Sequence, residues 1–543
     1  MLKVKFISPM EKVFRDAEPR QTEFCTRAYA GEPLCFQVCV TTTVTGRLYV
    51  ETDSDTAEFL EIEEVKYVPS LVADYEDPDD YRIFTERTST YYPDLLQPAG
   101  RSLKVVRGYW STLFVTVRAG APAGEHYIKF KMGDYDYRDV LAEETFCFSV
   151  SEASLAPCDI PVSCWIYYDS IAKAHGKKLF SAGYYKILKN YFRHATENGI
   201  NTVFVPLFSH PQKDVRGKAP EIVQLLIVRE ENGAFGYDFS RLEKFLDTAI
   251  GCGYKYFEFS HVASQQGAEH CPKIMGEKNG EMGALFDCGV PATDERYWRF
   301  LSGAFSGVYR ILQKKGIAER AFFHISDEPQ KVSAEKYMKI GKYMREILPY
   351  ANLIDAVSDE CFANADFLTY PVAATNRTKP FEKRDFWVYY CCDQSGEYLS
   401  NRFFNFPLLR TRVIGVQLYL NGTKGFLHWA YNYWLNLSTL EYIDPMLSSD
   451  GGGIMPSGDC YLIYPDKAAG DAFSSLREKA FAEGLRDYRA LKTIEKAKGR
   501  AYVLELLRRF GFAGFTQYPH DEKMFLKFTN WLSYNIEREF GFA

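Results

Sequence analysis

Up to about residue 150, the chain alternates between hydrophobic and polar side chains with a period of two. Turn signals such as GAPAGE and MGDYD separate the runs, and no amphipathic helical stretch of useful length lies between them. The alternating runs are LCFQVCV, RLYVET, IEEVKYV, STLFVTVRA, EHYIKFKM and ETFCFSV. This pattern predicts an N-terminal β-sandwich domain over residues 1–150, followed by a linker at 151–161.

From residue 160 the pattern changes to strand, helix, strand, helix, which favours a parallel sheet with helical crossovers. Good helices are predicted over 183–200, 296–317, 334–349 and 474–499. Short apolar runs predict strands at 160–168, 201–208, 255–262, 320–327, 352–358, 367–373, 386–392 and 425–431. Eight such units in roughly 340 residues are the count expected for a (β/α)8 barrel.

The expected fold class is therefore multidomain, combining β with α/β. We expect a sandwich at 1–150, a (β/α)8 TIM-type catalytic barrel at 151–500, and a C-terminal helical extension at 501–543. The last segment ends in FLKFTNWLSYNIEREFGFA and is predicted to form helices that pack on the barrel.

Composition narrows the classes of function. The chain has 65 Lys and Arg against 71 Asp and Glu, a formal charge of -6 without a long basic stretch, so no nucleic-acid partner is expected. We see no signal peptide and no 18-residue apolar run, which favours a cytoplasmic protein without a membrane partner. The 13 scattered cysteines suit reduced thiols. Without a CxxC pair or HExxH motif we expect no metal ion, and no cofactor.

Candidate chemistry gathers at the predicted strand ends, where barrels of this type carry their active sites. Asp327 and Glu328 end the fourth strand, in FFHISDEPQ. Polar or aromatic residues at other strand ends are Tyr168, Asp169, His210, His261, Asp359, Tyr390, Trp429 and Asn432. The Gly-rich insertion at 263–291 has the length of a lid or a subsite wall.

Two adjacent carboxylates do not fit the usual glycosidase scheme, which places two carboxyl groups about 5 Å or about 6.5–9.5 Å apart across the substrate. Pro329 is expected to restrict Glu328 to extended or polyproline conformations, so that both side chains face one substrate. The exception to the scheme is substrate-assisted hydrolysis, in which the 2-acetamido group of the sugar is the nucleophile. Asp327 suits the orientation of that group, and the longer Glu328 suits protonation of the leaving oxygen.

Six blocks of the sequence stand in order over roughly residues 255–495. They are FEFSHVASQQGAEHCPKI, FFHISDEP, FWVYYCC, SNRFFNFPLLRTRVIGVQLYLNGTKGFLHWAYNYW, PSGDCYLIYP and SLREKAFAEGLRDYRAL. They resemble, in the same order, blocks of the glycoside hydrolase family 123 and DUF4091 group. The group contains β-N-acetylgalactosaminidases and uncharacterised relatives with a sandwich and a catalytic barrel. The resemblance implies that Asp327 and Glu328 perform substrate-assisted catalysis, although this chain is nearer to the uncharacterised members.

Further residues are candidates for contact with the sugar. A tyrosine should donate to the acetamido oxygen; we choose Tyr390, with Tyr389 as the alternative, because strand alternation sends only one of them inward. His261 is a candidate for binding a sugar hydroxyl or for a buried structural role, and His324 is expected to be a satisfied core residue. Stacking or polar contacts are expected from Trp429, Asn432 and Trp434, all in HWAYNYW.

The leading hypothesis is a retaining, exo-acting glycoside hydrolase that releases terminal β-linked N-acetylhexosamine, with N-acetylgalactosamine favoured, by substrate-assisted catalysis. A second is a glycosidase of the same fold acting on a sugar without an acetamido group. A third is a catalytically silent glycan-binding protein. Intact Asp327 and Glu328 count against the third, and a carbohydrate is the expected partner in all three.

Overall fold

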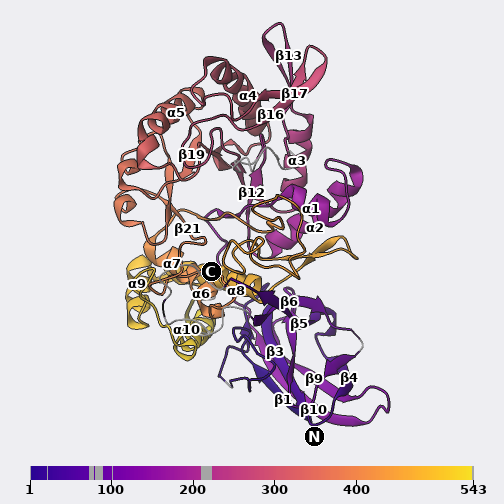
Figure 1. Ribbon diagram of the computed structural model, residues 1–543. Coiled ribbons are helices and arrows are strands. Elements are labelled where there is room, and N and C mark those ends of the chain that lie inside the picture. Colours follow the sequence, from indigo (N-terminus) through magenta and orange to yellow (C-terminus); the bar gives the residue numbers. More distant parts are fainter. Residues whose placement is uncertain are drawn as a thin grey trace.

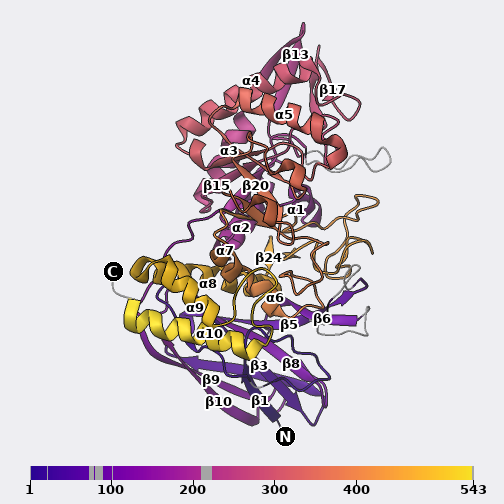
Figure 2. The same cartoon turned by 90° about the vertical axis from the view of Figure 1, so that its left-hand side faces the viewer.

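The computed structural model describes residues 2–20, 22–72, 79, 90–100, 102–209 and 223–540. A β-sandwich lies at one end and a barrel at the other, and the C-terminal helices lie at their junction (Figures 1 and 2). His210, one of the predicted strand-end residues, lies outside the described residues.

Two five-stranded sheets form the sandwich. In order, one sheet contains β1 (Leu2–Ile7), β3 (Leu34–Thr42), β8 (Trp110–Val117), β5 (Leu60–Ser70) and β6 (Thr90–Pro98). The other contains β2 (Arg27–Ala28), β10 (Val140–Val150), β9 (Gly124–Asp134), β4 (Gly46–Ser54) and β7 (Leu103–Val105). The six predicted strands are confirmed. Strand β6 was not predicted because it contains Pro93 and Pro98, and it lies at a sheet edge, where proline is tolerated.

Both faces of β3 are buried, which a two-layer sandwich alone would not require. Phe36 and Val38 point into the core between the sheets. On the opposite face, Gln37 donates hydrogen bonds to the backbone oxygens of Ser8 and Glu11. Cys35, on the same face, joins the core that extends into the barrel. The second face of this sheet therefore packs against the rest of the molecule.

Eight parallel strands close into a barrel, and all eight predicted strands are confirmed. In order they are β11 (Val162–Cys164), β12 (Thr202–Val205), β15 (Tyr256–Phe259), β18 (Ala321–His324), β19 (Asn352–Ala356), β20 (Tyr370–Ala374), β21 (Trp387–Tyr389) and β22 (Phe426–His428). They are nearly fully buried, as expected for strands enclosed by side chains inside and helices outside.

The ring of helices around the barrel is less regular than a (β/α)8 fold predicts. The predicted helices are present as α2 (Ala182–Glu197), α4 (Glu295–Lys314), α5 (Ala334–Ile347) and α8 (Leu476–Lys498). The remaining α-helices of the described barrel region are α1 (Tyr168–Ala174), α3 (Ser240–Gly251), α6 (Leu408–Arg412) and α7 (Ile414–Asn421). The connections from β19 to β20 and from β20 to β21 carry only the 3-10 turns Glu360–Phe362 and Lys379–Phe381. These two connections therefore cross without an α-helix.

Insertions after β12 and β15 combine into one small sheet, in the order β14 (Ala234–Asp238), β13 (Ile227–Glu231), β16 (Ile274–Lys278) and β17 (Glu281–Phe286). It projects at the end of the molecule opposite the sandwich (Figure 1). Residues 274–286 of the insertion at 263–291 thus form a hairpin of this sheet, whereas Gln265 and Gln266 near its start line the cavity described below.

The junction of barrel and sandwich is polar and buried. The guanidinium of Arg477, at the start of α8, pairs with Asp94 of β6 through two bonds of 2.9 Å. Lys12 donates to the backbone oxygens of Phe404 and Phe406 in the barrel. The last helices, α9 (Arg500–Arg509) and α10 (Glu522–Asn535), follow α8 beside the sandwich (Figure 2). No helix in the described ranges is long and apolar enough to cross a membrane.

Candidate active site

The two adjacent carboxylates lie on a strained corner of the backbone directly after β18. Asp327 has φ of 85° and Glu328 has φ of 47°. Glu328 therefore does not take the extended conformation that Pro329 was expected to impose. Residues other than glycine pay about 1–3 kcal/mol for such conformations, and they keep them only where tertiary contacts hold them.

Hydrogen bonds from neighbouring strands and loops hold this corner. The backbone N–H groups of Ser326 and Asp327 donate to the carboxylate of Asp355 over 2.9 and 3.0 Å. The N–H of Glu328 donates to the oxygen of Ala356 at 2.9 Å, and the N–H of Gln266 donates to the oxygen of Asp327 at 2.8 Å. These hydrogen bonds hold the backbone in its bent conformation in place of an extended one. As a result, both side chains point toward one cavity.

The cavity has a volume of about 500 Å³ and opens at the carboxyl ends of the barrel strands. This size is within the range of ordinary ligand sites. Its lining is Trp165, Tyr167, Gln265, Gln266, Asp327, Glu328, Ala356, Tyr389, Cys391, Cys392, Asp393, Leu427, Trp429, Tyr433, Leu437, Leu440, Ile454 and Met455. Aromatic and aliphatic side chains thus surround a small group of acids and amides.

Each carboxylate of the pair has its own side-chain partner in the cavity. Gln265 Nε2 donates to Asp327 Oδ2 at 2.9 Å. The hydroxyl of Tyr389 donates to Glu328 Oε1 at 2.6 Å. Both partners also line the cavity, so the two acids are held in different orientations toward the same space.

The surroundings of the pair favour a retained proton. Burial raises the pKa of Asp327 well above its ordinary value, and the charges of Glu328 and Asp355 raise it further. Burial also raises the pKa of Glu328, against the effect of the hydrogen bond from Tyr389. Because two acids in one corner do not both ionise easily, the pair holds one proton to a higher pH than an isolated carboxyl would. Such a pair can supply a general acid beside a carboxylate.

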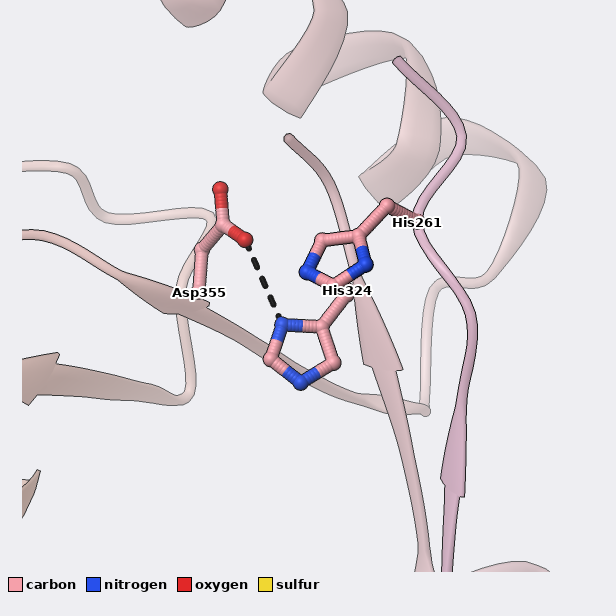
Figure 3. Close-up of side chains that lie close together, drawn as sticks. All are labelled: His261, His324 and Asp355. Atoms are coloured by element: carbon pink, nitrogen blue, oxygen red, sulfur yellow. Dashed lines mark hydrogen bonds and ion pairs between the residues drawn. The ribbon is translucent and has the colours of Figure 1, made fainter. Parts of the chain in front are cut away.

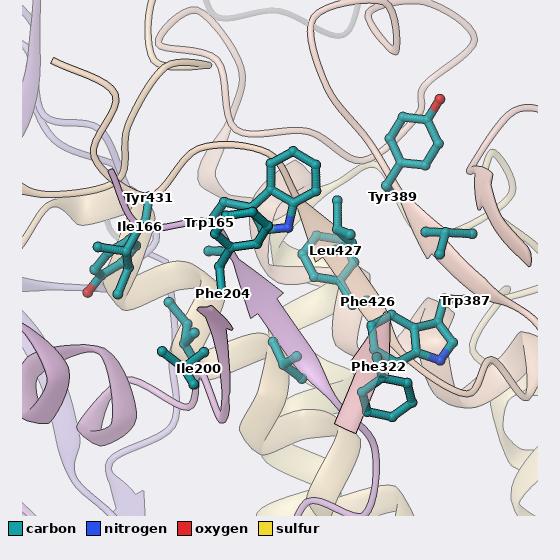
Figure 4. Close-up of a cluster of buried hydrophobic side chains, with 14 of the residues drawn as sticks. Trp165, Ile166, Ile200, Phe204, Phe322, Trp387, Tyr389, Phe426, Leu427 and Tyr431 are labelled. Atoms are coloured by element: carbon teal, nitrogen blue, oxygen red, sulfur yellow. The ribbon is translucent and has the colours of Figure 1, made fainter. Parts of the chain in front are cut away.

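Of the two candidate tyrosines, Tyr389 lies in the cavity and Tyr390, the first choice from the sequence, does not. Tyr389 lines the cavity and contacts Glu328, whereas Tyr390 is 1% exposed and packs against the rings of Phe426 and His428. In Figure 4 the hydroxyl of Tyr389 points away from the buried hydrophobic cluster. Alternation along the short strand β21 sends successive side chains to opposite sides, so only one of them reaches the substrate space.

Of the three candidates in HWAYNYW, only Trp429 lies in the cavity. Its Nε1 donates to Asp459 Oδ2 at 2.9 Å, which fixes the plane of the ring at the wall. Asn432 is fully buried and bonds the backbone of Tyr167. Trp434 is fully buried and donates to the oxygen of Ile463. Both hold the loop together and do not line the cavity.

His261 and His324 lie beneath the cavity, in the interior of the barrel. Both are fully buried, and their ring centroids are 4.2 Å apart. His324 Nε2 bonds Glu258 at 2.5 Å and its Nδ1 faces Asp355 at 3.3 Å, which confirms the expected satisfied core residue (Figure 3). Burial alone would lower the pKa of His324, but the bonds and charges of Asp355 and Glu258 raise it to about 9.

Three of these residues, His261, His324 and Asp355, offer ligand atoms within 4.8 Å of one another, which is within reach of one metal ion. Both nitrogens of His324 already face carboxylates, and a raised pKa favours the imidazolium, which does not ligate metals. The group therefore fits a hydrogen-bonded charge cluster better than a metal centre.

Sequence reasoning missed several cavity residues. Tyr433 lies in the same motif as Trp429, and Gln265 follows the third strand in ASQQG. Both could have been predicted, because each lies shortly after a predicted barrel strand, where such barrels carry their sites. Asp355 does not line the cavity but holds the backbone of the corner, and a charged residue in the middle of the apolar run NLIDAVS is a usable signal of such a buried role. Trp165 and Asp393 offered no distinctive pattern.

Comparisons with known proteins support the assignment of the fold. The solved structure of a family 123 glycoside hydrolase from Clostridium perfringens, described as acting in glycolipid glycan hydrolysis, is similar with a TM-score of 0.74. The two chains are 14% identical, and the match covers 99% of each. At this identity the likeness shows a shared fold alone.

Two other solved structures show a weaker likeness. A family 5 mannosidase from Rhizomucor miehei matches at 13% identity over 61% of this chain and 94% of its own, with a TM-score of 0.33. A β-glucuronidase from Bacteroides uniformis matches at 9% identity over 86% and 48%, with a TM-score of 0.29. Among curated protein sequences, none matches this chain.

The family model described as the catalytic domain of glycoside hydrolase 123 matches residues 165–494, more than half of the chain. The matched region contains every barrel strand from β12 onward and all the cavity residues named above. The chain belongs to glycoside hydrolase family 123 and is a glycoside hydrolase.

Proposed function

We propose that this protein is a retaining, exo-acting hydrolase that releases terminal β-linked N-acetylhexosamine by substrate-assisted catalysis. N-acetylgalactosamine is the favoured sugar, as the family resemblance implies. The relative from Clostridium perfringens is described in terms of glycolipid glycan hydrolysis, which makes a glycan with a terminal amino sugar the natural substrate class to test first.

One observation carries the proposal: two adjacent carboxylates turn into a single cavity from one strained corner. A double-displacement glycosidase places its nucleophile and acid about 5 Å apart on opposite sides of the anomeric carbon, usually from different strands. Neighbouring residues approach the sugar from the same side. This arrangement suits a reaction in which the sugar supplies its own nucleophile and the protein supplies an acid and an orienting carboxylate.

In this mechanism, Asp327 accepts a hydrogen bond from the acetamido N–H and stabilises the positive charge of the oxazolinium ion that forms. Burial raises the pKa of Asp327 as well as that of Glu328, but the acetamido N–H and the charge of His324 both favour the anion of Asp327. Glu328 therefore holds the proton of the pair when substrate is bound and delivers it to the leaving oxygen. After departure, the same Glu328 takes a proton from the water that opens the ring. The net configuration is retained because both displacements invert the anomeric carbon.

Neighbouring side chains complete the site. Tyr389 contacts Glu328 and lies where its hydroxyl can turn to the acetamido oxygen, the role first considered for Tyr390. The ring of Trp429, with Tyr433 beside it at a centroid distance of 5.3 Å, offers an apolar surface for the C–H face of a pyranose. Gln265 holds Asp327 in its orientation.

A third carboxylate keeps the competing function open. Asp393 lines the same cavity, and its charge raises the pKa of Glu328. If Asp393 approached the anomeric carbon from the other side, Glu328 and Asp393 would form a conventional pair, and no acetamido group would be needed.

A panel of chromogenic β-glycosides, with and without the 2-acetamido group, separates the two functions. We expect turnover of the N-acetylgalactosaminide and N-acetylglucosaminide and none of the parent galactoside and glucoside. As a second test, 2-fluoro glycosides, which trap an enzymic nucleophile, should leave no adduct in the mass spectrum. A glycosylated peptide containing Asp393 would replace the substrate-assisted mechanism with the conventional one.

A further inference from the structure

A buried network of charged side chains lies directly beneath the catalytic corner. Glu258, His324 and Asp355 come from the adjacent strands β15, β18 and β19, and each is fully buried. Glu258 accepts hydrogen bonds from Ser163 and, at 2.6 Å, from Nε1 of Trp165, which lines the cavity. The network thus joins the floor of the cavity to the corner above it.

Asp355 is the member that touches the corner. Its carboxylate accepts the backbone N–H groups of Ser326 and Asp327, at 2.9 and 3.0 Å, and the N–H of Ile325 lies at 3.4 Å. Successive N–H groups point to one side only where the backbone leaves the extended strand. A carboxylate at this position therefore stabilises the bend that brings Asp327 and Glu328 into one cavity.

His324 balances the charge of the network. It lies between two buried carboxylates: its Nε2 bonds Glu258, and its Nδ1 faces Asp355 (Figure 3). Buried carboxylates are tolerated only when paired, and an imidazolium between them supplies one positive charge. The same charge favours the ionised form of Asp327, which would otherwise face Glu328 and Asp355 without compensation.

We propose that Asp355 is a positioning residue that holds the Asp327–Glu328 corner in its bent conformation, and that His324 is the buried cation that lets Asp327 ionise. The part that concerns His324 rests on the proposed function, because that function requires Asp327 to be an anion. The positioning role of Asp355 holds for any hydrolysis by this corner.

The groups that face this network come from several elements. Asp327 faces Glu328 in the corner, Gln265 after β15, Asp355 on β19 and His324 on β18. Among the described residues, further titratable or charged neighbours are Glu258 and His261 against His324, Tyr337 of α5 against Asp355, Tyr167 against Asp327, and Tyr389, Cys391, Cys392 and Asp393 against Glu328.

Two variants test the two parts separately on the best chromogenic substrate of the wild type. Asp355→Asn replaces a carboxylate, which has two acceptor oxygens, by an amide with one, so some of these backbone N–H groups lose their partner. The corner should then be misplaced, and kcat should fall about 100-fold with little change in KM. The same variant removes a negative charge, so the acid limb of the kcat/KM profile should move to lower pH. His324→Gln removes a positive charge and should move that limb to higher pH, by about one pH unit.

Asp359→Asn is the matched control, because Asp359 lies just after β19 but is half-exposed and caps a 3-10 turn through Cys361 N–H. It should leave kcat and both limbs unchanged. Thermal denaturation of all variants identifies any that are unfolded. A crystal structure of Asp355→Asn should show Asp327 and Glu328 leaving positive φ.

Several outcomes would overturn the inference. An Asp355→Asn variant with wild-type kcat and an unchanged corner refutes the positioning role. The charge role is refuted if the acid limb of the kcat/KM profile stays in place in the two variants, or moves in the same direction in both. A stoichiometric metal ion bound to the purified wild type would also refute it. If the wild type hydrolyses glycosides without a 2-acetamido group and not those with one, the proposed function is contradicted instead. The kinetic and crystallographic comparison of Asp355→Asn with wild type would still test the positioning role.

Discussion

The hydroxyl of Tyr389 donates a hydrogen bond to Glu328 Oε1 over 2.6 Å, while its sequence neighbour Tyr390 is buried against Phe426 and His428. Adjacent residues on one short strand thus belong to two different environments. The first contacts Glu328, which we propose as the general acid, and the second belongs to the core. This difference makes the two tyrosines a matched pair for mutagenesis.

Tyr389→Phe should lower kcat/KM about 100-fold, the size of effect expected for the loss of a donor to developing charge. The hydrogen bond lowers the pKa of Glu328, so its removal should raise that pKa and move the basic limb of the profile to higher pH. Tyr390→Phe should leave both quantities near wild type. Equal losses in the two variants would show that Tyr389 acts only through the fold.

Glu328→Gln should abolish most turnover of natural glycans and of aryl glycosides with poorly acidic phenols. Glycosides of acidic phenols should lose much less, because general acid catalysis is worth about 10²- to 10⁴-fold and matters least when the leaving group departs unaided. A plot of log kcat/KM against the pKa of the phenol is the measurement. A slope equal to that of the wild type would remove Glu328 from the role of acid.

The Asp327–Glu328 pair should reduce the stability of the fold at neutral pH. Burial raises the pKa of both carboxyls, so the folded protein binds more protons than the unfolded chain between the ordinary and the raised values. The free energy of unfolding therefore falls as pH rises through that window, by about 1.4 kcal/mol per carboxyl for each pH unit that the window spans.

Two variants follow from this linkage. Asp327→Asn and Glu328→Gln should melt at a higher temperature than wild type at about pH 7.5. The advantage should shrink as the pH falls to about 3, below the ordinary pKa values of Asp and Glu, where the wild-type carboxyls are mostly protonated in both states. Asp393→Asn, which changes an exposed carboxylate of the same cavity, is the control and should show little pH-dependent gain. Neutral variants that are less stable than wild type at the higher pH would contradict the prediction.

The pair of Arg477 with Asp94 should be essential to the attachment of the sandwich, which we propose acts as a scaffold. Both side chains are almost fully buried, with exposures of 0% and 1%. Asp94→Ala leaves a buried guanidinium uncompensated and should lower the free energy of unfolding by about 3–5 kcal/mol. Asp136→Ala breaks a pair with Arg47 whose side chains are 63% and 48% exposed, and should change it by less than about 1 kcal/mol. Equal effects of the two substitutions in denaturant titrations would contradict the prediction.

The same interface predicts the behaviour of the barrel without the sandwich. A fragment of residues 155–543 would expose the buried face of α8 and the chain around Lys12's acceptors, and should aggregate or lose activity. Size-exclusion chromatography and turnover of the fragment are the measurements. A monodisperse fragment with wild-type kcat would show that the sandwich is dispensable.

The sequence by itself determined most of the secondary-structure elements, and it pointed to the strand end at which the candidate site lies. All eight barrel strands, the six strands predicted for the sandwich and the four predicted helices are present, because burial on one or both faces imposes a local period that is visible in any window of the chain. Asp327 and Glu328 were recognisable because they directly follow a predicted strand, where a parallel barrel opens its site.

Only the tertiary structure decided which side chains share the cavity. Tyr389 rather than Tyr390 contacts Glu328, Asn432 and Trp434 support a loop, and Asp355 reaches the corner from the neighbouring strand. Glu328 took a positive φ against the local preference set by Pro329, because Ala356 accepts its N–H. Contacts between residues far apart in sequence decide which side chains reach the cavity and which backbone conformation the corner takes. The energies of these contacts exceed the small energy differences behind local conformational preferences, which are all that a sequence pattern reports.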